Sequence, residues 1–78
     1  MAKGKVGDAR LALRRCPAAG SRWTHRKSGG RYTVVAGVVI EATVTPAVAY
    51  RSDETRVTWV RPLVEFLDGR FTPLPLED

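Results

Sequence analysis

Short alternating runs of side chains between residues 22 and 72 constrain the fold most, because turn-forming residues bound each run. Trp23 and His25, for example, share one face of a predicted strand, and Ser28-Gly29-Gly30 then supplies a hairpin turn. We therefore predict five short strands. They cover residues 22–26, 32–45, 47–51, 56–60 and 70–72.

The second of these predicted strands is the longest. Gly37 interrupts it, as a bulge or a sharp bend in a small barrel requires. An entirely apolar alternating set beyond Gly37 predicts the core face: Val38, Ile40, Ala42 and Val44. Glu41, Thr43 and Thr45 are then expected to point outward or into a cleft. Pro46 cannot donate to a central ladder, so it marks an edge or a turn.

A helical turn is predicted before the last strand. Pro62 presets φ for one turn of 3₁₀- or α-helix over residues 63–66. This plan is typical of a small SH3-like five-stranded barrel, an all-β fold. Closure is inferred, because small β domains must cover their open edges. Tyr50 and Phe66 are expected in the core, with the Tyr50 hydroxyl at its rim.

Residues 1–21 are predicted to form a flexible basic N-terminal arm in front of the barrel domain, residues 22–78. Residues 1–31 contain nine Lys and Arg and one acidic residue, Asp8, so their net charge is +8. Residues 32–78 contain four basic and seven acidic residues, so their net charge is −3. Asp8 is placed to cap a short helix through Arg15. We expect a weak helix or disorder here.

Size and composition limit the setting of the protein. A chain of 78 residues makes one domain with a small core, so a monomer and a homo-oligomer both stay open. Cys16 is the only cysteine, which excludes an internal disulfide and fits a reducing compartment. No apolar run approaches the roughly 18 residues of a membrane span. We expect a cytoplasmic protein without membrane contact.

Aromatic and basic residues interleave around the first predicted hairpin. The ring of Trp23 can stack on a base, and His25 or Arg26 can donate to phosphate. Alternatively, Trp23 plugs the end of the barrel and His25 hydrogen-bonds a backbone carbonyl. The turn that runs from Arg26 to Arg31 gathers amides and cations that can hold an anion, unless it is a solvated hairpin tip.

Further candidates follow in the later strands. Arg61 comes two residues after Trp59 and can pair with phosphate, or internally with Glu65 or Glu41. Glu41 and Thr43 can hydrogen-bond a base or ribose, or simply lie on an exposed strand face. The complete set of predicted ligand-binding residues is Trp23, His25, Arg26, Arg31, Tyr32, Glu41, Thr43, Trp59 and Arg61.

Catalytic and metal-binding patterns are weak in this sequence. The single His and the single Cys have no sequence partner that would make a nucleophile–base pair. Asp53 and Glu54 share one turn, where solvation is the simpler interpretation. A metal site needs more ligands than His25 and scattered carboxylates provide. We predict no enzyme activity, no metal and no cofactor.

Four segments resemble a family of small bacterial and phage domains of unknown function, numbered sixteen fifty-three. The matching stretches are Trp23-Thr24-His25, residues 29–34, Val48-Ala49-Tyr50 and residues 59–66, which begin with Trp59-Val60-Arg61-Pro62-Leu63. The resemblance covers residues 22–67. The family usually has a His-Ser-Glu-Thr-like stretch between its two Tyr strands, where this chain has residues 41–46. The resemblance implies a fold more than a function.

These features together predict a non-catalytic module that binds a phosphate-bearing, nucleotide-like ligand by stacking and charge. In a phage setting, which the resemblance permits, one concrete form is the sequestration of a nucleotide signal of host defence. One alternative is nucleic-acid binding, in which the arm neutralises phosphates and the aromatic residues stack on bases. Another is a protein-interaction module with an aromatic peptide groove.

Overall fold

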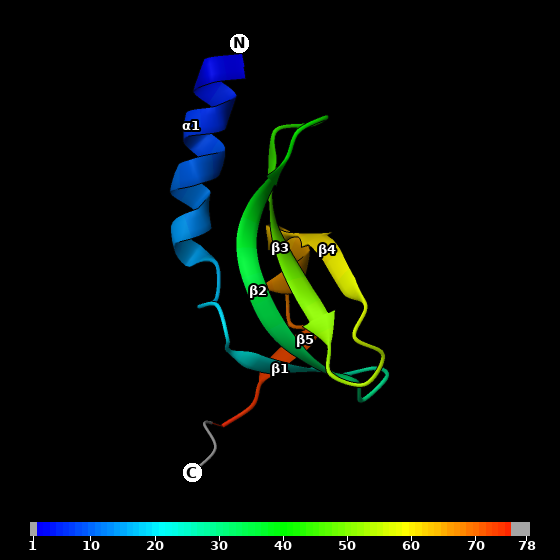
Figure 1. Cartoon of the computed structure of the whole chain (residues 1–78). Coiled ribbons are helices and arrows are strands. Elements are labelled where there is room, and N and C mark those ends of the chain that lie inside the picture. Colours follow the sequence, from blue (N-terminus) through cyan, green and yellow to red (C-terminus); the bar gives the residue numbers. More distant parts are fainter. Residues whose placement is uncertain (1, 76–78) are drawn as a thin grey trace.

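The computed structural model describes residues 2–75, with side chains from residue 5 onward. Five antiparallel strands form one sheet in the order β4-β3-β2-β1-β5 (Figure 1). The strands are β1 (Arg22–His25), β2 (Arg31–Ile40), β3 (Thr45–Ser52), β4 (Thr58–Pro62) and β5 (Phe71–Pro73). The predicted five-stranded, mostly β architecture is confirmed. Residue 1 of the predicted arm and residues 76–78 of the predicted barrel domain lie outside the described residues.

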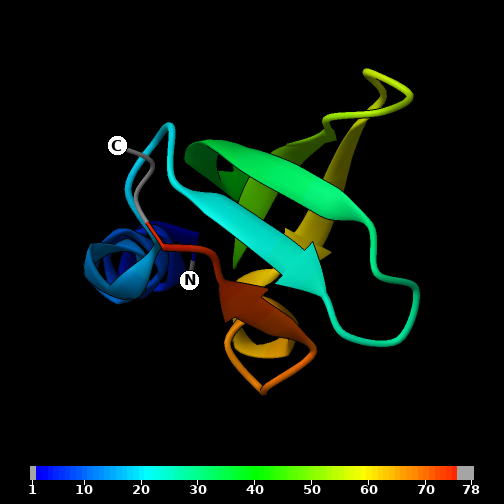
Figure 2. The ribbon, with the colours of Figure 1, turned by 90° about the horizontal axis from the view of Figure 1, so that it is seen from below.

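The sheet is open between its two edge strands. Within residues 2–75, β4 and β5 do not pair, so closure into a barrel is not found there. The predicted helical turn is present as α2 (Leu63–Phe66), which follows Pro62 directly. Figure 2 shows α2 next to β5. A short helix, rather than a fifth ladder, therefore joins the two edges of the sheet.

The strand predicted over residues 32–45 is wrong at its far end, because the chain reverses at residues 41–44. β2 ends at Ile40, and Ile40 pairs directly with Thr45 at the start of β3. Val44 has a φ of 52°, in the left-handed region that a turn of this kind uses. The single predicted strand thus contains nearly all of β2, a turn and the first residue of β3.

Pro46 occupies an edge position in β3, which is one of the two alternatives predicted for it. It pairs with Val39 of β2, whereas β4 pairs with β3 only from Ala47 onward. The Ser52 amide donates to the Val57 carbonyl, so the backbone N–H of Ser52 points toward β4. Backbone groups alternate in direction along a strand, so every second residue counted back from Ser52 also points toward the β4 side. Pro46 belongs to this set, and its missing N–H therefore interrupts no ladder.

A bulge between Val34 and Ala36 exchanges the two faces of β2. Val34 opposes Tyr50 on the core face, whereas beyond the bulge Gly37 opposes Val48 on that face. The core face predicted for the second half of the run is therefore wrong, because counting by twos does not register the bulge. The residues of that set are half-buried or exposed: Val38, Ile40, Ala42 and Val44.

Aromatic rings fill the core between the sheet and α2. Phe66 and Phe71 stack with their ring centroids 4.3 Å apart, and Tyr50 meets both rings edge-on. Tyr50 and Phe66 are buried, as predicted. The whole buried cluster is Val34, Val48, Tyr50, Leu63, Phe66 and Phe71. Burying a side chain of this size stabilises a fold by about 1.5–3 kcal/mol, so these few residues dominate the stability.

The segment before β1 is helical. α1 (Ala2–Ala12) continues into the 3₁₀ turn η1 (Leu13–Arg15). The helix begins well before the predicted start, so Asp8 lies inside it and not at its N-cap. Ala9 is buried and Cys16 packs against the core cluster, which shows that this segment contacts the sheet domain. Among the described residues, no helix has the length and apolar character needed to cross a membrane.

Gly37 marks a close approach between the helical segment and β2. A Cβ at this position would lie 3.1 Å from both the Cys16 Sγ and the Leu13 Cδ2. The bulge predicted at Gly37 lies instead next to Val34. Glycine is therefore needed here because two side chains pack onto its backbone, and not because the strand bends.

Candidate functional site

A hollow of about 250 Å³ lies between β4 and the β1–β2 turn, residues 26–30. All five strands contribute to its lining. The lining residues are His25, Ser28, Tyr32, Tyr50, Trp59, Arg61 and Phe71. We call it the aromatic hollow. It brings together four residues that the sequence predicted as ligand contacts, namely His25, Tyr32, Trp59 and Arg61.

Cross-strand pairing builds the walls of the aromatic hollow. Trp59 opposes Tyr50 in the β3–β4 ladder, and the Tyr32 and Tyr50 rings meet edge-to-face with centroids 5.3 Å apart. His25 opposes Phe71 in the β1–β5 ladder, with ring centroids 5.0 Å apart. Tyr50 and Phe71 are buried, whereas Trp59 is 53% exposed. The hollow thus has a buried aromatic floor and an open indole at its rim.

Arg61 is held in place at the side of this hollow. Its Nε donates to the Tyr50 hydroxyl at 3.2 Å, and its Nη1 donates to the Glu65 carboxylate at 3.2 Å. The internal pair with Glu65 was one of the predicted alternatives. The hydrogen bond to Tyr50, with the nearby negative charge of Glu65, raises the pKa of Arg61 above its ordinary value. Neither contact uses Nη2, so this nitrogen remains a donor for a ligand.

His25 is oriented by the turn that follows it. The Ser28 backbone N–H donates to His25 Nδ1 at 3.3 Å, and the Ser28 hydroxyl lies 3.1 Å from the same nitrogen. An amide can only donate, so Nδ1 is the acceptor and the neutral ring carries its proton on Nε2. The predicted alternative, a bond from His25 to a backbone carbonyl, is therefore replaced by a bond from a backbone amide. Nε2 is left as a donor.

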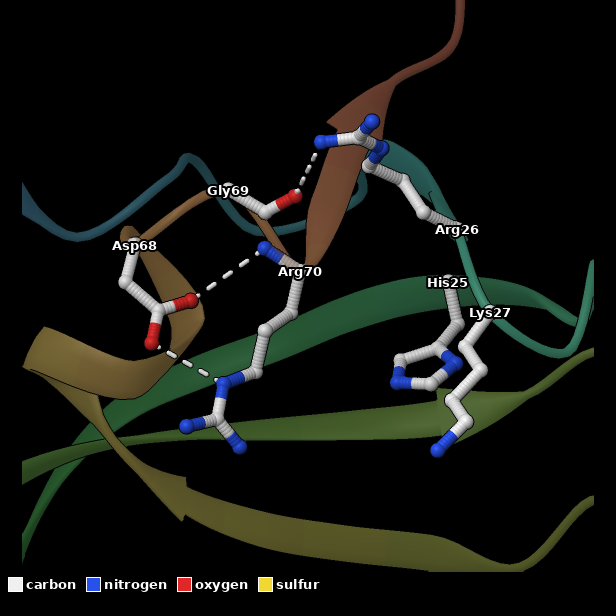
Figure 3. Close-up of a pocket in the computed structure, with 6 residues that line it drawn as sticks. All are labelled: His25, Arg26, Lys27, Asp68, Gly69 and Arg70. Atoms are coloured by element: carbon white, nitrogen blue, oxygen red, sulfur yellow. Dashed lines mark hydrogen bonds and ion pairs between the residues drawn. The ribbon is translucent and has the colours of Figure 1, made fainter.

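A second hollow, of about 670 Å³, lies on the other side of His25 (Figure 3). Its lining residues are His25, Arg26, Lys27, Asp68, Gly69 and Arg70. We call it the basic hollow. The β1–β5 pairing creates it, because the Arg26 amide donates to the Arg70 carbonyl at 2.9 Å. His25 lines both hollows, so the aromatic and the basic hollow are adjacent to each other.

Hydrogen bonds fix two of the three cations of the basic hollow. Arg70 donates to Asp68 from its Nε at 2.9 Å and from its backbone at 3.2 Å. Desolvation alone raises the pKa of Asp68, but these bonds outweigh it, and the pKa falls below its usual value. Figure 3 shows Arg26 turned toward the Gly69 carbonyl, whereas Lys27 and Arg70 extend along the same side as His25.

Trp23 does not line either of these hollows. Its indole is half-buried and meets the Phe66 ring edge-on, with centroids 5.3 Å apart. Its Nε1 donates to the Ser21 hydroxyl at 3.0 Å. Trp23 therefore packs against the core cluster, and its predicted roles, stacking on a ligand or plugging the end of a barrel, stay predictions.

The other predicted residues lie apart from the two hollows. Glu41 and Thr43 are exposed in the β2–β3 turn, at the end of the sheet opposite the β1–β2 turn (Figure 1). The chain reversal at residues 41–44 carries them there, so the prediction that they join the same ligand site is wrong. Arg31 is exposed and lines a neighbouring hollow together with Tyr32 and Trp59.

Sequence reasoning missed Arg70 as a site residue. The predicted strand over residues 70–72 begins with Arg70, but only the β1–β5 pairing brings this residue beside His25 and Arg26. Lys27 was part of the predicted anion-binding turn but was not chosen as a ligand contact. Knowing the strand order in advance would have identified both.

The basic helix lies away from these hollows. Figures 1 and 2 both place α1 on the opposite side of the molecule from the β1–β2 turn. Lys5 and Arg10 of α1 and Arg14 of η1 are exposed, and the two arginines line a separate hollow of about 250 Å³. The positive charge of the N-terminal third is therefore divided between two surfaces.

Within the described part of the chain, neither the cysteine nor the carboxylates form a further reactive centre. Cys16 is half-buried, and burial raises the pKa of its thiol, which lowers the fraction of nucleophilic thiolate. Over the described residues, no three His, Cys, Asp or Glu side chains gather as a metal site.

No protein-family model, curated protein or solved structure matches this chain. The resemblance to the family numbered sixteen fifty-three therefore stays a prediction.

Proposed function

We propose that this chain is a non-catalytic binding module for an anionic, ring-bearing ligand of the nucleotide class. The ring lies in the aromatic hollow and the phosphate lies in the basic hollow. One observation carries the proposal: His25 lines both hollows, so a single ligand can contact aromatic rings and cations at once.

The aromatic hollow suits the ring of such a ligand. Trp59 offers an exposed indole beside Tyr32, and base–aromatic stacking is worth about 1–3 kcal/mol per base. The Nη2 of Arg61 can add a hydrogen bond at the ring edge. Small-molecule pockets usually measure about 300–1,000 Å³, so a hollow of about 250 Å³ suits one ring system rather than a whole dinucleotide.

The basic hollow suits the phosphate. Lys27 and Arg70 extend along the same side as His25, whose Nε2 carries a proton that can be donated. Asp68 occupies the Nε of Arg70 and the Glu65 carboxylate lies 3.8 Å from its Nη1, so Nη2 is the nitrogen of this guanidinium that would meet phosphate. Charge-assisted hydrogen bonds of this kind are about twice as strong as neutral ones.

The finer fold assignment belongs to the same proposal. An SH3-like barrel is supported by the strand order β4-β3-β2-β1-β5 and by the helical turn between β4 and β5. In such a barrel, the two hollows would lie beside the turn between the first two strands. The phage setting and the sequestration of a nucleotide immune signal rest on the family resemblance alone.

The position of α1 favours a nucleotide over a long nucleic acid. A nucleic acid that used both basic surfaces would have to reach around the molecule, because α1 lies opposite the β1–β2 turn. Binding within the two hollows needs no contribution from the helix. The peptide-groove alternative would use the aromatic hollow but leaves the adjacent cations without a partner.

Isothermal titration calorimetry of the full chain tests the proposal, with cyclic mononucleotides, ADP-ribose and inorganic phosphate as probes. We expect heat with at least one nucleotide and much weaker binding of phosphate alone, since phosphate cannot use the aromatic hollow. A single-stranded oligonucleotide serves as the competing probe. If no nucleotide gives heat or a thermal shift, or if only the oligonucleotide binds, the proposal is wrong.

A further inference from the structure

The two edges of the sheet differ in how well they are protected. β5 is short and ends at Pro73, and both features discourage pairing with another strand. β4 is longer and apolar: Trp59 is 53% exposed, Val60 is 54% exposed, and Val57 directly before the strand is 43% exposed. Figure 1 shows β4 at the outer side of the sheet, with no described element beyond it. An exposed apolar edge of this kind is a template for another strand.

The backbone groups at this edge can be assigned from the β3–β4 ladder. The Ser52 amide donates to the Val57 carbonyl at 2.9 Å, so the Val57 carbonyl points toward β3. Hydrogen-bonded and non-hydrogen-bonded pairs alternate in an antiparallel ladder, so Trp59 and its partner Tyr50 form a hydrogen-bonded pair. Thr58 and Val60 therefore turn their N–H and C=O groups away from β3, toward the open edge.

We propose that two copies of this chain pair antiparallel through β4, with a two-fold axis between their Trp59 residues. In this register, Thr58 bonds to the partner subunit's Val60, and all the outward backbone groups of both residues are used. A register centred on Thr58 would need Arg56, which lies in the preceding turn with a φ of 66°. A register centred on Val60 would need Pro62, which has no N–H.

The side chains fit this register. Trp59 faces the partner subunit's Trp59 in a non-hydrogen-bonded pair, where Cβ atoms come within about 4.5–5.5 Å. The paired indoles lie on the face that carries Tyr50 and the aromatic hollow, because Trp59 opposes Tyr50 in the ladder. Arg61 faces the partner subunit's Val57, so no two arginines stand directly opposite each other. Aromatic cross-strand pairs stabilise a sheet, whereas opposed like charges would destabilise it.

A second copy is the occupant that this edge fits best. A two-fold interface requires one surface to be complementary to itself, and the pairing of Thr58 with Val60 around Trp59 meets this requirement. The core of a chain of 78 residues is small, so the area buried between two copies adds stability that the monomer lacks. The inference concerns assembly alone and does not depend on the nucleotide proposal.

Sedimentation equilibrium of the wild-type chain gives the first test. We expect a mass of twice the 8.6 kDa of one chain at micromolar concentrations. The substitution Val60→Lys places a charge on the open edge at a side chain that is already exposed, so the subunit should still fold. We expect it to raise the dimer dissociation constant about 30-fold or more. The matched control is Thr72→Lys on the β5 edge, which should change nothing.

Single cysteines test the register. In a Cys16→Ser background, Trp59→Cys should form a disulfide-linked dimer under mild oxidation, because the two positions face each other across the axis. Val60→Cys should not, because Val60 faces the partner subunit's Thr58. A monomeric wild type, a Val60→Lys protein that dimerises as tightly as the wild type, or the reverse crosslinking pattern would overturn the proposal. Binding of an unrelated peptide to a monomeric chain would overturn it as well. Because Val60 lies outside the two hollows, nucleotide binding by Val60→Lys separates this result from the function.

Discussion

Two regions of this molecule are rich in Arg and Lys, and they differ in what surrounds the charges. In the N-terminal helical segment, Arg10 of α1 and Arg14 of η1 are exposed and line a hollow beside Leu11. Around the β1–β2 turn, the charges stand next to aromatic rings: Arg61 is held by the buried Tyr50, and Arg70 is held by Asp68. Composition alone makes the two regions look equivalent, and the contacts show that they are not.

The difference concerns preorganisation. A guanidinium that is already held in one orientation loses little side-chain entropy when a ligand binds, so more of the hydrogen-bond energy appears as affinity. An exposed cation on a helix contributes mainly a long-range attraction, and salt screens this attraction over about 8–10 Å. The hollows beside His25 therefore are suited to specific recognition, whereas α1 is suited to raising the encounter rate with anions.

Removing two positive charges from each region should show the largest difference between the two regions in nucleotide affinity. We expect Lys27→Gln with Arg70→Gln to weaken nucleotide binding about 100-fold, because each charge-assisted hydrogen bond contributes about 1.5 kcal/mol or more. Arg10→Gln with Arg14→Gln removes the same charge from α1 and η1 and should change the affinity less than about threefold at physiological salt. Calorimetry at two salt concentrations measures both effects. Equal losses would show that net charge, and not the hollow, determines binding.

Two glycines test how α1 is attached to the sheet. Gly37→Ala should destabilise the fold by about 1–2 kcal/mol, because the new Cβ would lie 3.1 Å from Cys16 and Leu13 and must displace them. Gly7→Ala should stabilise it by about 0.5–1 kcal/mol, because Gly7 lies in an exposed helix interior and nothing lies within 4 Å of the position that a methyl group would take. Urea denaturation measures both changes. A neutral Gly37→Ala would mean that α1 and η1 do not pack on β2.

Local signals were sufficient for much of the fold. The strand alternation, the Gly-Gly hairpin and the Pro62 turn each depend on neighbouring residues, and the structure has all three near their predicted places. No local sequence signal of this kind marks the bulge next to Val34 or the chain reversal at residues 41–44. Polar and apolar residues alternate straight through the reversal, and the bulge lies in an unbroken apolar run, so the sequence pattern marks neither.

The candidate site was predictable to the extent that strand positions were. His25, Tyr32, Trp59 and Arg61 lie on or next to predicted strands that began near their observed starts, and they meet in one hollow. Arg70 was missed because its position depends on the pairing of the first strand with the last, and no local pattern encodes that pairing. Glu41 and Thr43 were placed wrongly for the related reason that a turn moved them to the far end of the sheet.

The smallest predicted effect concerns the pH dependence of stability, and it is tested by comparing Arg22 of β1 with Arg10 of α1. Arg22 at the start of β1 donates to Asp53 at 2.6 Å, and the Thr33 hydroxyl donates to the same carboxylate at 2.8 Å. The hydrogen bond from Arg22 is the largest cause of a lowered pKa for Asp53, and the bond from Thr33 adds to it. This pair connects β1 to the β3–β4 turn, whereas Arg10 lies on the exposed face of α1.

A carboxyl whose pKa is lowered by folding stabilises the fold above its unfolded pKa of about 4, and this contribution is lost as the pH falls through the lowered value. Arg22→Gln should therefore cost less than about 1 kcal/mol at neutral pH, since both side chains are partly exposed. It should also make the loss of stability below pH of about 4 shallower. Arg10→Gln should leave the pH curve of urea denaturation unchanged. If both substitutions had the same effect, the acid sensitivity would reflect overall charge, and the Arg22–Asp53 contact would contribute nothing of its own.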